Sequence, residues 1–291
     1  MGALDGRVVV ITGAGRGMGR EHARLAAAEG ASVVVNDSGT SRDGTGADPT
    51  VAEAVAAELA ETGADVRTSV DDVSTLEGAR RVLGTAFDAW GRVDALVNNA
   101  GVLRDRMFVN MTEDDWDAVV RGHLRSTFCT SRIAAEHWRE RTKAGETVRA
   151  SLVNVSSTSG LLGSVGQTNY GAAKAGIAAL SVILAQELGR YGVRVNAIVP
   201  VARTRMTEEV AGIAERVRAP EDPAVFDTYH PANVSPLVAW LATADCPLTG
   251  RVLFVRGGQI RVMDGWRQGQ RFEQDGPWTV AACARALAEL G

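Results

Sequence analysis

Short β-branched runs alternate with longer alanine-rich stretches along most of this chain. The apolar runs are continuous rather than interleaved with polar residues, which is typical of strands buried on both faces of a parallel sheet. They lie at residues 8–11, 32–35, 66–70, 95–97, 151–155, 193–199 and 252–255. Helical periodicity occupies the stretches between them, at residues 17–29, 50–62, 74–89, 113–139, 168–189 and 233–242.

An α/β fold follows from this order of elements. Strands that alternate with helices form a parallel sheet, so we expect a doubly wound, seven-stranded Rossmann fold with helices on both faces, over residues 1–258. Residues 38–49 are rich in Gly, Ser and Asp, which predicts a surface loop after the second strand. Residues 259–291 form a C-terminal extension that contains Trp266 and Trp278 and closes on a short helix. Because two tryptophans are costly to leave in water, we expect this extension to dock on the same or a neighbouring subunit.

The composition is that of a compact domain with a sizeable core, with 45% hydrophobic and 23% charged residues among 291. A formal net charge of −4 argues against nucleic acid as a partner. No apolar stretch approaches the roughly 18 to 20 residues of a spanning helix, which predicts no membrane segment. The cysteines Cys129, Cys246 and Cys283 are far apart and lack metal-ligand spacing, so we expect reduced thiols, no metal site and a cytoplasmic location.

A glycine-rich turn with the sequence TGAGRGMG, residues 12–19, follows the first strand and leads into the first helix. Such a turn lets the backbone approach a pyrophosphate closely, while the free N–H groups of the helix attract it. A tight turn without a ligand is the plainer alternative, but the strand before and the helix after favour a dinucleotide. The residues expected at the dinucleotide are Gly13, Arg16, Gly17, Met18 and Gly19.

Asp37 stands at the end of the second strand, about 20 residues after the glycines, where a carboxylate can accept hydrogen bonds from the adenosine ribose. A 2′-phosphate would be repelled at this place, which favours NAD over NADP. An aspartate at a strand end can also be a simple cap, and Arg16 could accept a phosphate. NADP is therefore kept as the alternative cofactor.

Three motifs in this order resemble those of the short-chain dehydrogenase/reductase family. The first is the TGxxxGxG spacing of the glycine turn. The second is Asp-Val at residues 72–73, which the resemblance places beside the adenine. The third is Asn-Asn-Ala-Gly at residues 98–101, which taken alone could be an ordinary turn. From these two motifs the resemblance adds to the expected cofactor site Asp72, Val73, Asn99, Ala100 and Gly101.

Tyr170 and Lys174 are four positions apart in a predicted helix, so their side chains share one face. Ser157 lies just past the fifth strand, at the sheet edge where active sites of α/β folds collect. Hydride transfer to a carbonyl needs a proton donor, and Lys174 supplies a positive charge that would lower the pKa of the Tyr170 phenol. Ser157 would hold the carbonyl oxygen. In the family these three positions are catalytic, and Tyr170 and Lys174 are also expected at the cofactor.

Lysine is rare in this chain. Of the 31 cationic residues, all except Lys143 and Lys174 are arginine. A core-facing tyrosine and a solvated surface lysine would be the plain structural interpretation of residues 170 and 174. The rarity of lysine argues against it, because tuning a phenol and bonding a ribose hydroxyl needs a compact ammonium rather than a guanidinium.

Two positions depart from the family pattern. His123 stands where the family places an Asn that holds a water for proton relay. A lone helix histidine is more often structural, yet an imidazole can also bind that water, and we hypothesise that His123 substitutes in the relay. Residues 200–204 stand where the family has Pro-Gly followed by Thr, and the resemblance implies that Thr204 bonds the nicotinamide carboxamide. Residues 203–229 are expected to form a mobile lid over the substrate.

Nearly the whole chain, residues 6–268, resembles the D-3-hydroxyacyl-CoA dehydrogenase module of peroxisomal multifunctional β-oxidation enzymes. The likeness is carried by VVVNDS at residues 33–38, by VLRDR at residues 102–106 and by residues 250–260 with Trp266. It implies an NAD-dependent oxidoreductase of a 3-hydroxyacyl or 3-oxoacyl thioester. The alternatives are an NADPH-dependent 3-oxoacyl-carrier-protein reductase, a dehydrogenase of steroids or other alcohols, and a non-catalytic dinucleotide-binding regulatory protein.

The family resemblance also implies a homotetramer, or a dimer, built largely by the helices after the fourth and fifth strands and by the C-terminal strand region. The sequence itself offers only apolar faces on those helices, which could equally pack on the sheet. The expected partners are a small-molecule substrate and further copies of this chain, with no nucleic acid and no membrane.

Overall fold

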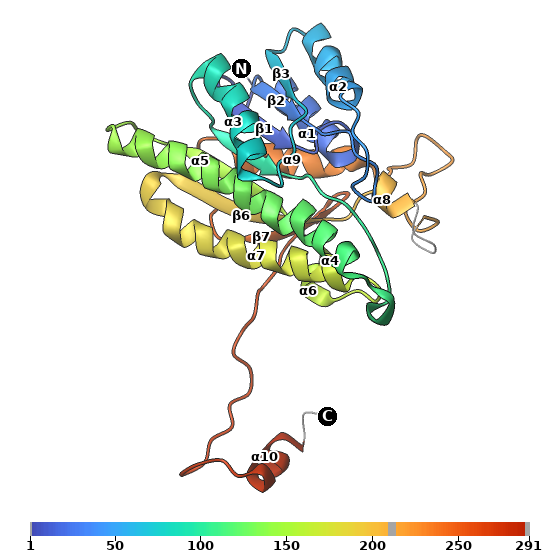
Figure 1. The fold of residues 1–291 in the computed structure, drawn as a ribbon, viewed down its shortest axis with the longest axis vertical. Coiled ribbons are helices and arrows are strands. Elements are labelled where there is room, and N and C mark those ends of the chain that lie inside the picture. The colour runs from blue at the N-terminus through green and yellow to red at the C-terminus, as the bar shows by residue number, and fades with distance from the viewer. Residues whose placement is uncertain (1, 209–213, 289–291) are drawn as a thin grey trace.

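The computed structural model describes residues 2–208 and 214–288 and contains an eight-stranded sheet (Figure 1). Its strands are β1 (Val8–Thr12), β2 (Ser32–Asn36), β3 (Val66–Ser69), β4 (Ala95–Asn98), β5 (Ala150–Val155), β6 (Val193–Pro200), β7 (Val252–Arg256) and β8 (Gln259–Val262). They follow the order β3-β2-β1-β4-β5-β6-β7-β8. Every neighbouring pair is parallel except β7 with β8. The order reverses between β1 and β4, and ligands of open α/β sheets bind at the carboxyl edge beside such a point.

The predicted α/β Rossmann class is confirmed, but the sheet has eight strands rather than seven. β8 lies within the stretch that the sequence pattern assigns to the C-terminal extension. The chain turns back after β7 over Gly257 and Gly258, and Arg256 pairs with Gln259 in the antiparallel ladder. The pattern misses β8 because this strand has only four residues, alternates polar with apolar side chains, and owes its place to the hairpin.

The prediction that every strand is buried on both faces is wrong for β3. This strand pairs with β2 alone and forms one edge of the sheet. Its residues Arg67 and Thr68 are exposed, and Val70, which the pattern includes, lies beyond the strand and is 45% exposed. An edge strand has a neighbour on one side only, so solvent reaches side chains that a central strand would cover.

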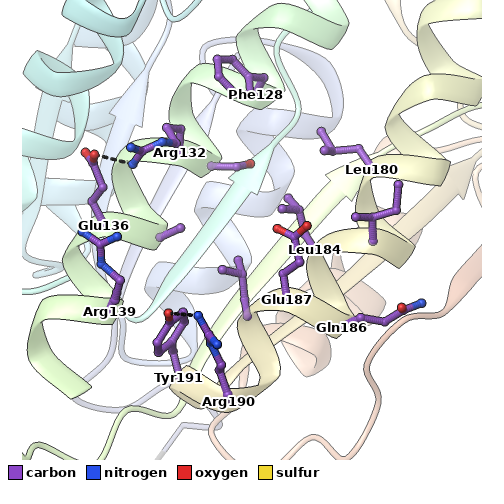
Figure 2. Close-up of a pocket in the computed structure, with 14 residues that line it drawn as sticks. Phe128, Arg132, Glu136, Arg139, Leu180, Leu184, Gln186, Glu187, Arg190 and Tyr191 are labelled. Carbon is purple, nitrogen blue, oxygen red and sulfur yellow. Dashed lines mark hydrogen bonds and ion pairs between the residues drawn. The ribbon is translucent and has the colours of Figure 1, made fainter. Parts of the chain in front are cut away.

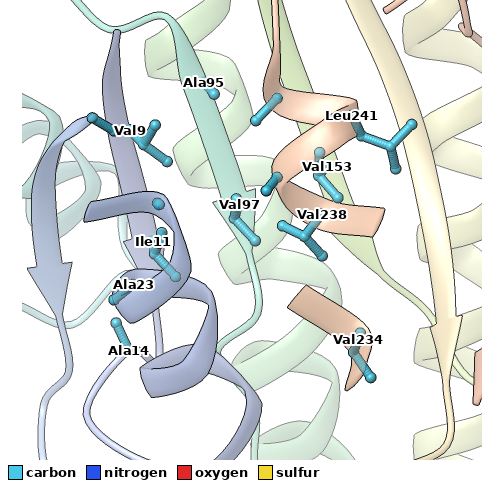
Figure 3. Close-up of a cluster of buried hydrophobic side chains, with 14 of the residues drawn as sticks. Val9, Ile11, Ala14, Ala23, Ala95, Val97, Val153, Val234, Val238 and Leu241 are labelled. Carbon is cyan, nitrogen blue, oxygen red and sulfur yellow. The ribbon is translucent and has the colours of Figure 1, made fainter. Parts of the chain in front are cut away.

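Helices cover both faces of the sheet. On one face lie α1 (Gly17–Ala28), α2 (Thr50–Glu61) and α9 (Ser235–Ala242), and on the other lie α3 (Leu76–Trp90), α5 (Ser126–Lys143) and α7 (Thr168–Leu188). Alternate residues of β1 pack against the helices on opposite faces of the sheet. Val9 and Ile11 pack with α1 and α9 (Figure 3), whereas Val8 and Val10 pack with α3 and α5. This double burial explains why the central strands read as unbroken apolar runs.

The predicted helix over residues 113–139 is interrupted. α4 (Glu113–Val120) is followed by a π-helical turn, η2 (Arg121–Arg125), and then by α5. His123 lies in this wider turn and is buried. A π turn inserts one extra residue into the helical register and often marks a functional position. Short helices that the sequence pattern does not show are η1 (Phe108–Asn110), α6 (Thr158–Leu162), η3 (Gly189–Tyr191), α8 (Arg205–Glu208) and η4 (Pro231–Val234).

One helical stretch, Thr168–Tyr191, is long and apolar enough by composition to cross a membrane, contrary to the expectation that no stretch approaches such a length. In the structure, α7 packs against β6. Its residues Ala173, Ile177 and Leu188 are buried there. This packing is that of a helix covering a sheet, which is why its inward face is apolar.

Beyond β8 the chain leaves the domain. Residues 264–278 contain no helix or strand, and α10 (Val280–Leu287) lies apart from the sheet (Figure 1). Trp266 is fully exposed and Trp278 is 44% exposed. The described part of the extension thus points away from its own domain, and docking on the same or a neighbouring subunit stays a prediction. Residues 289–291 of the predicted extension lie outside the described part.

Candidate active site

The glycine-rich turn joins β1 to α1 at the carboxyl edge of the sheet. Gly13 and Gly17 have φ values of 63° and 52°, in the left-handed region that favours glycine. A Cβ atom at Gly13 would lie 2.8 Å from the Cα of Ala100, and one at Gly19 would lie 2.0 Å from the carbonyl oxygen of Gly13. A side chain is therefore excluded at Gly13 and at Gly19, where the turn packs closely on the segment after β4 and on itself.

Thr12 and Asn99 hold this turn against the end of β4. The Nδ2 group of Asn99 donates to the carbonyl oxygens of Thr12 at 3.0 Å and of Gly13 at 2.9 Å. In return, the Oγ1 atom of Thr12 accepts from the backbone N–H groups of Asn99 and Ala100, both at 3.1 Å. The Asn-Asn-Ala-Gly motif thus shapes the glycine turn. A direct contact between Asn99 and a cofactor stays a prediction.

A cavity of about 570 Å³ lies beside the turn, a volume within the range of cofactor sites. The predicted cofactor residues that line it are Gly13, Arg16, Gly17, Met18, Asp37, Asp72, Val73, Asn99, Ala100, Gly101 and Thr204. Gly19 is buried behind the turn. The glycine-rich turn, the N-terminus of α1 and the cavity together fit a nicotinamide dinucleotide, whose pyrophosphate needs a close backbone approach.

Asp37 stands next to the glycine turn, as predicted. Its Oδ2 atom accepts a hydrogen bond from the N–H of Gly15 at 2.9 Å, and its Oδ1 atom accepts from the N–H of Gly39 at 2.8 Å. Each oxygen keeps a further lone pair that can accept a ribose hydroxyl. Arg16, the alternative phosphate ligand, donates to the carbonyl oxygen of Thr40 at 3.2 Å. Its guanidinium is therefore turned toward the loop that follows Asp37.

Residues 38–49, called the insert below, form the predicted loop and also a wall of the cavity. The insert folds back onto the segment after β4. The N–H of Leu103 donates to the carbonyl oxygen of Arg42 at 2.8 Å, and the Nε of Arg104 donates to that of Asp43, also at 2.8 Å. The composition of the insert predicts a loop but not its partner, because Arg104 and Asp43 are 61 residues apart in the sequence.

α7 presents Tyr170 and Lys174 on one face, as their spacing predicts. The ammonium nitrogen of Lys174 lies 5.6 Å from the centre of the Tyr170 ring and donates to the carbonyl oxygen of Val155 at 2.6 Å. Ser157 precedes α6, and its Oγ accepts from the N–H of Ser159 at 3.2 Å. Ser157 also lies close enough to Tyr170 to lower the pKa of the phenol. The three predicted catalytic side chains therefore meet at the carboxyl end of β5.

Burial sets the ionisation of this group. It raises the pKa of Tyr170 to about 12 and lowers the pKa of Lys174 to about 7, because the charged form of each residue loses hydration. The polar hydroxyl of Ser157 lowers the pKa of the phenol, while the negative charge of Asp105 raises it. The predicted acidification of Tyr170 by Lys174 is thus not seen in this structure, since the pKa of the phenol lies above its usual value.

His123 lies between the cavity wall and Tyr170. Its Nε2 atom is 2.7 Å from the carbonyl oxygen of Val102 and 3.2 Å from the N–H of that residue, and the shorter contact places a proton on Nε2. The His123 and Tyr170 rings meet edge to face, with 5.1 Å between centroids. Burial, reinforced by the charge of Lys174, lowers the pKa of His123 well below its ordinary value. The imidazole is therefore neutral at physiological pH.

The second ring nitrogen of His123 is the atom available to a proton relay. Nδ1 is buried and has no hydrogen-bond partner among the described residues. In the neutral ring with a proton on Nε2, Nδ1 carries a free lone pair that can hold a water molecule. The structure thus places His123 beside Tyr170 with an acceptor to spare, and its part in a relay stays a hypothesis.

Gly101 makes room for His123. A Cβ atom at Gly101 would lie 1.9 Å from the Cε1 atom of the imidazole, closer than any side chain tolerates. The sequence motif predicts Gly101 at the cofactor but does not show this second requirement. The signal in the sequence is the unusual histidine itself, because a ring bulkier than the expected Asn needs space from a neighbour.

Thr204 lines the cavity and is the second residue of the predicted lid. Arg203 ties the two ends of that lid together. Its N–H donates to the carbonyl oxygen of Tyr229 at 2.6 Å, and its guanidinium pairs with Asp227 at 2.5 Å. Residues 209–213 of the predicted lid lie outside the described part of the chain. The sequence does not reveal Arg203, because its partners come from the far end of the lid.

Comparison with known proteins gives consistent findings. A family model described as short chain dehydrogenase matches residues 7–212. A hydroxyacyl-CoA dehydrogenase of Mycobacterium tuberculosis is 42% identical over 94% of this chain and 84% of its own length. The peroxisomal multifunctional enzyme type 2 of Mus musculus is 39% identical over 88% of this chain, which spans 32% of that protein. The crystal structure of a short chain dehydrogenase from Mycobacterium avium has a TM-score of 0.88 and 44% identity, covering 99% of this chain and 95% of that chain.

Proposed function

The chain belongs to the short-chain dehydrogenase family, and from this membership we propose that it transfers a hydride between NAD and a 3-hydroxyacyl or 3-oxoacyl thioester. As a member of the family it is an oxidoreductase that acts on CH–OH groups with a nicotinamide dinucleotide. The observation that carries this reaction is the meeting of Tyr170, Lys174 and Ser157 at the carboxyl end of β5, next to β4, whose following residues line the cofactor cavity. The thioester is supported by the names of the relatives, a hydroxyacyl-CoA dehydrogenase and a peroxisomal multifunctional enzyme.

Tyr170 is the group that exchanges a proton with the substrate oxygen. With a pKa of about 12 the phenol is protonated at neutral pH, which is the form that donates a proton to a carbonyl oxygen during reduction. In the oxidation direction the phenolate must form, and a nearby cation lowers the free energy of ionising the phenol. Lys174 holds such a charge 5.6 Å from the ring when it is protonated. The nicotinamide, when bound, would donate the hydride in reduction and accept it in oxidation.

Ser157 and Lys174 orient the reacting groups. The Ser157 hydroxyl donates to the substrate oxygen and shares the charge that develops on it. The ammonium of Lys174 has three donors, of which one bonds the carbonyl oxygen of Val155. Two donors remain for ribose hydroxyls of the cofactor, so one side chain can fix both the ribose and the charge beside Tyr170.

NAD is favoured over NADP by the position of Asp37. Its carboxylate lines the cavity and is held by the N–H groups of Gly15 and Gly39, so it cannot turn away from an approaching ligand without losing both bonds. A 2′-phosphate would meet this negative charge, whereas ribose hydroxyls can donate to it. Arg16, the residue that could accept a phosphate, donates a hydrogen bond to Thr40 of the insert.

The test is a dehydrogenation screen with NAD, read by the absorbance of NADH, over 3-hydroxyacyl-CoA esters of graded chain length, steroids and simple secondary alcohols. We expect turnover of the thioesters, and we expect Tyr170→Phe to reduce it about 100- to 10,000-fold while still binding NADH. Activity confined to steroids would contradict the proposed thioester substrate. Binding of NADH without turnover of any substrate would favour a non-catalytic dinucleotide-binding protein.

A contact between copies of the chain, which the family resemblance implies, is supported by the outward faces of α5 and α7. Phe128, Val182 and Ile183 are 48%, 37% and 52% exposed, so these faces do not pack only on the sheet. Between the two helices lies a groove of about 700 Å³, lined by Phe128, Leu180, Ile183 and Leu184 with charged side chains around them (Figure 2). An apolar centre with a charged rim is typical of protein interfaces.

A further inference from the structure

Asp105 lies in the segment after β4, between the insert and the segment that follows Ser157. Its Oδ2 atom is 3.8 Å from the Nη2 atom of Arg42 in the insert. The same oxygen accepts a hydrogen bond from the Nε2 group of Gln167 at 3.0 Å. One carboxylate therefore contacts both the loop that walls the cofactor cavity and the residue just before α7.

Hydrogen bonds continue from Gln167 to the catalytic serine. The Oε1 atom of Gln167 accepts from the hydroxyl of Ser159 at 2.7 Å. The N–H of Ser159 in turn donates to the Oγ of Ser157 at 3.2 Å. Together with the two contacts of Asp105, these bonds form an unbroken polar path from the insert to the hydroxyl that holds the substrate oxygen.

The backbone follows the same path. The N–H of Arg106 donates to the carbonyl oxygen of Gly166 at 2.8 Å, and Arg106 forms an isolated parallel bridge with Gln167. The residue next to Asp105 is therefore fixed to the residue next to Gln167. Asp105 and the segment after Ser157 are therefore joined by main chain as well as by side chains.

The second oxygen of Asp105 points to a role other than stability. Oδ1 is buried and accepts no hydrogen bond from the described residues, which is costly for a carboxylate. The charge of Asp105 also reaches the reacting group, since it raises the pKa of Tyr170. The other ionisable groups around this phenol are Lys174 and His123, and Arg42 is the cation that faces Asp105. The charge of Asp105 thus affects the ionisation of Tyr170, while its carboxylate contacts the insert and the residue before α7.

We propose that Asp105 is a positioning residue that couples the insert over the cofactor cavity to the placement of Ser157. The coupling passes through Arg42 on one side and through Gln167 on the other. A dinucleotide that fixes the insert then also fixes the serine hydroxyl, so the substrate oxygen is held fully only after the cofactor is in place. Because the cavity and the serine are those of the proposed function, the coupling presupposes that function.

Separate substitutions break the two links one at a time. Arg42→Ala removes the contact with the insert, and Gln167→Ala removes the contact toward the serine. Asp105→Asn removes the charge but keeps an oxygen that can accept from Gln167. Asp245→Asn is the matched control, because Asp245 also pairs with an arginine, Arg149, away from the insert, and its replacement changes the charge by the same amount.

The first measurement is NADH binding, followed by the fluorescence of the reduced nicotinamide, which needs no turnover. We expect Arg42→Ala and Gln167→Ala each to raise the dissociation constant of NADH about three- to tenfold. Because both act through one carboxylate, the double variant should bind about as weakly as the worse single variant. Two effects that multiply would mean independent sites and would overturn the proposal.

The second measurement is hydrogen exchange of the protein without any ligand. We expect Arg42→Ala to speed exchange about threefold or more, both in the insert and in residues 159–167. Asp245→Asn should leave exchange in residues 159–167 unchanged. Unchanged exchange there in Arg42→Ala would overturn the coupling, even if that variant binds NADH weakly.

The third measurement is the pH profile of alcohol oxidation by Asp105→Asn. Removal of the negative charge lowers the pKa of Tyr170, so the rise of the rate with pH should shift toward lower pH, whereas a merely structural role would reduce the rate without moving the profile. If the unaltered protein neither binds NADH nor turns over substrate, the proposed function fails. If it does both and Asp105→Asn behaves like Asp245→Asn, only the coupling fails.

Discussion

Burial shifts the pKa values of two neighbouring side chains of α7 in opposite directions. The pKa of Tyr170 is raised to about 12, whereas the pKa of Lys174 is lowered to about 7. At neutral pH the pair therefore lies close to the boundary between one positive charge and none. A charged or hydrogen-bonding group placed beside Lys174 can decide its protonation state, and through it the cost of ionising the phenol.

The lowered pKa of Lys174 makes folding stability depend on pH. Between the folded pKa of about 7 and the ordinary value of 10.5, the unfolded chain binds a proton that the folded chain does not, so the free energy of unfolding rises with pH in this window. From pH 7 to pH 9 we expect the unaltered protein to gain about 2 kcal/mol more than Lys174→Met. Urea unfolding without cofactor measures both slopes, and equal slopes would contradict a buried neutral lysine.

Asp37 sets the cofactor preference at the scale of a single carboxylate. In Asp37→Ser the negative charge disappears, so a 2′-phosphate is no longer repelled and the ribose loses an acceptor. We expect kcat/KM with NAD to fall and kcat/KM with NADP to rise, with a combined change of about tenfold or more. Initial rates with both cofactors measure the ratio. Asp48→Ser in the same insert serves as a control that should leave the ratio unchanged, and a protein that prefers NADP from the outset would contradict the assignment.

The candidate site could be predicted from the sequence as far as its motifs are local. Gly13, Tyr170 and Lys174 stand out because the chemistry of a turn or of one helix face lies within a few residues of chain. The place of Asp105 could not be predicted in this way, since Gln167 reaches it across 62 residues. The pKa of Tyr170 was also beyond the motif, because burial depends on everything that packs around the phenol.

At the scale of elements, the predicted strands and helices agree with the structure where local pattern and packing coincide. The central strands are buried on both faces, and their continuous apolar runs predict them correctly. The π-helical turn η2 is different, because its sequence is compatible with a continuous helix. What sets it apart is the contact of His123 with Val102, which belongs to another segment. β8 likewise depends on its partner β7 rather than on its own composition.

The fit between η2 and the end of β4 can be tested at Gly101. In Gly101→Ala the new methyl group would overlap the His123 ring, which its contact with Val102 holds in place, so we expect the free energy of unfolding to fall by about 2 kcal/mol. His123→Ala removes the obstacle, and the double variant should therefore be more stable than the two separate losses imply. Chemical denaturation measures all three variants.

Gly84→Ala is the control for that series, because a Cβ atom at Gly84 in α3 would meet nothing within 4 Å. Alanine is favoured over glycine inside a helix, so this variant should be as stable as the unaltered protein or slightly more so. A Gly101→Ala protein as stable as Gly84→Ala, or a double variant with fully additive losses, would contradict the close packing of Gly101 on His123.

At the scale of the whole molecule, two of the parts that present apolar side chains outward bear on assembly. One is the groove between α5 and α7 (Figure 2). The other is the C-terminal extension, in which Trp266 is fully exposed and α10 stands apart from the sheet (Figure 1). A helix of eight residues is too short to persist alone in water, which favours a docked position for α10 in the assembled protein.

The groove between α5 and α7 gives the prediction for assembly. We expect the unaltered protein to be a tetramer or a dimer by size-exclusion chromatography with light scattering, and Ile183→Asp to shift it to a smaller species, because a buried unpaired charge is costly at an interface. Val165→Asp is the control, since Val165 is 86% exposed and does not line the groove. An unaltered protein that runs as a monomer would contradict the interface.

The burial of one of only two lysines bears on how the protein can be attached to a surface. An amine-acylating reagent meets the Lys143 side chain, which is 61% exposed at the end of α5, whereas Lys174 is only 3% exposed. Since β5 begins a few residues after Lys143, this amine lies at the amino edge of the sheet, opposite the cavity. Beads coupled through it would hold each molecule with its cleft toward the solution.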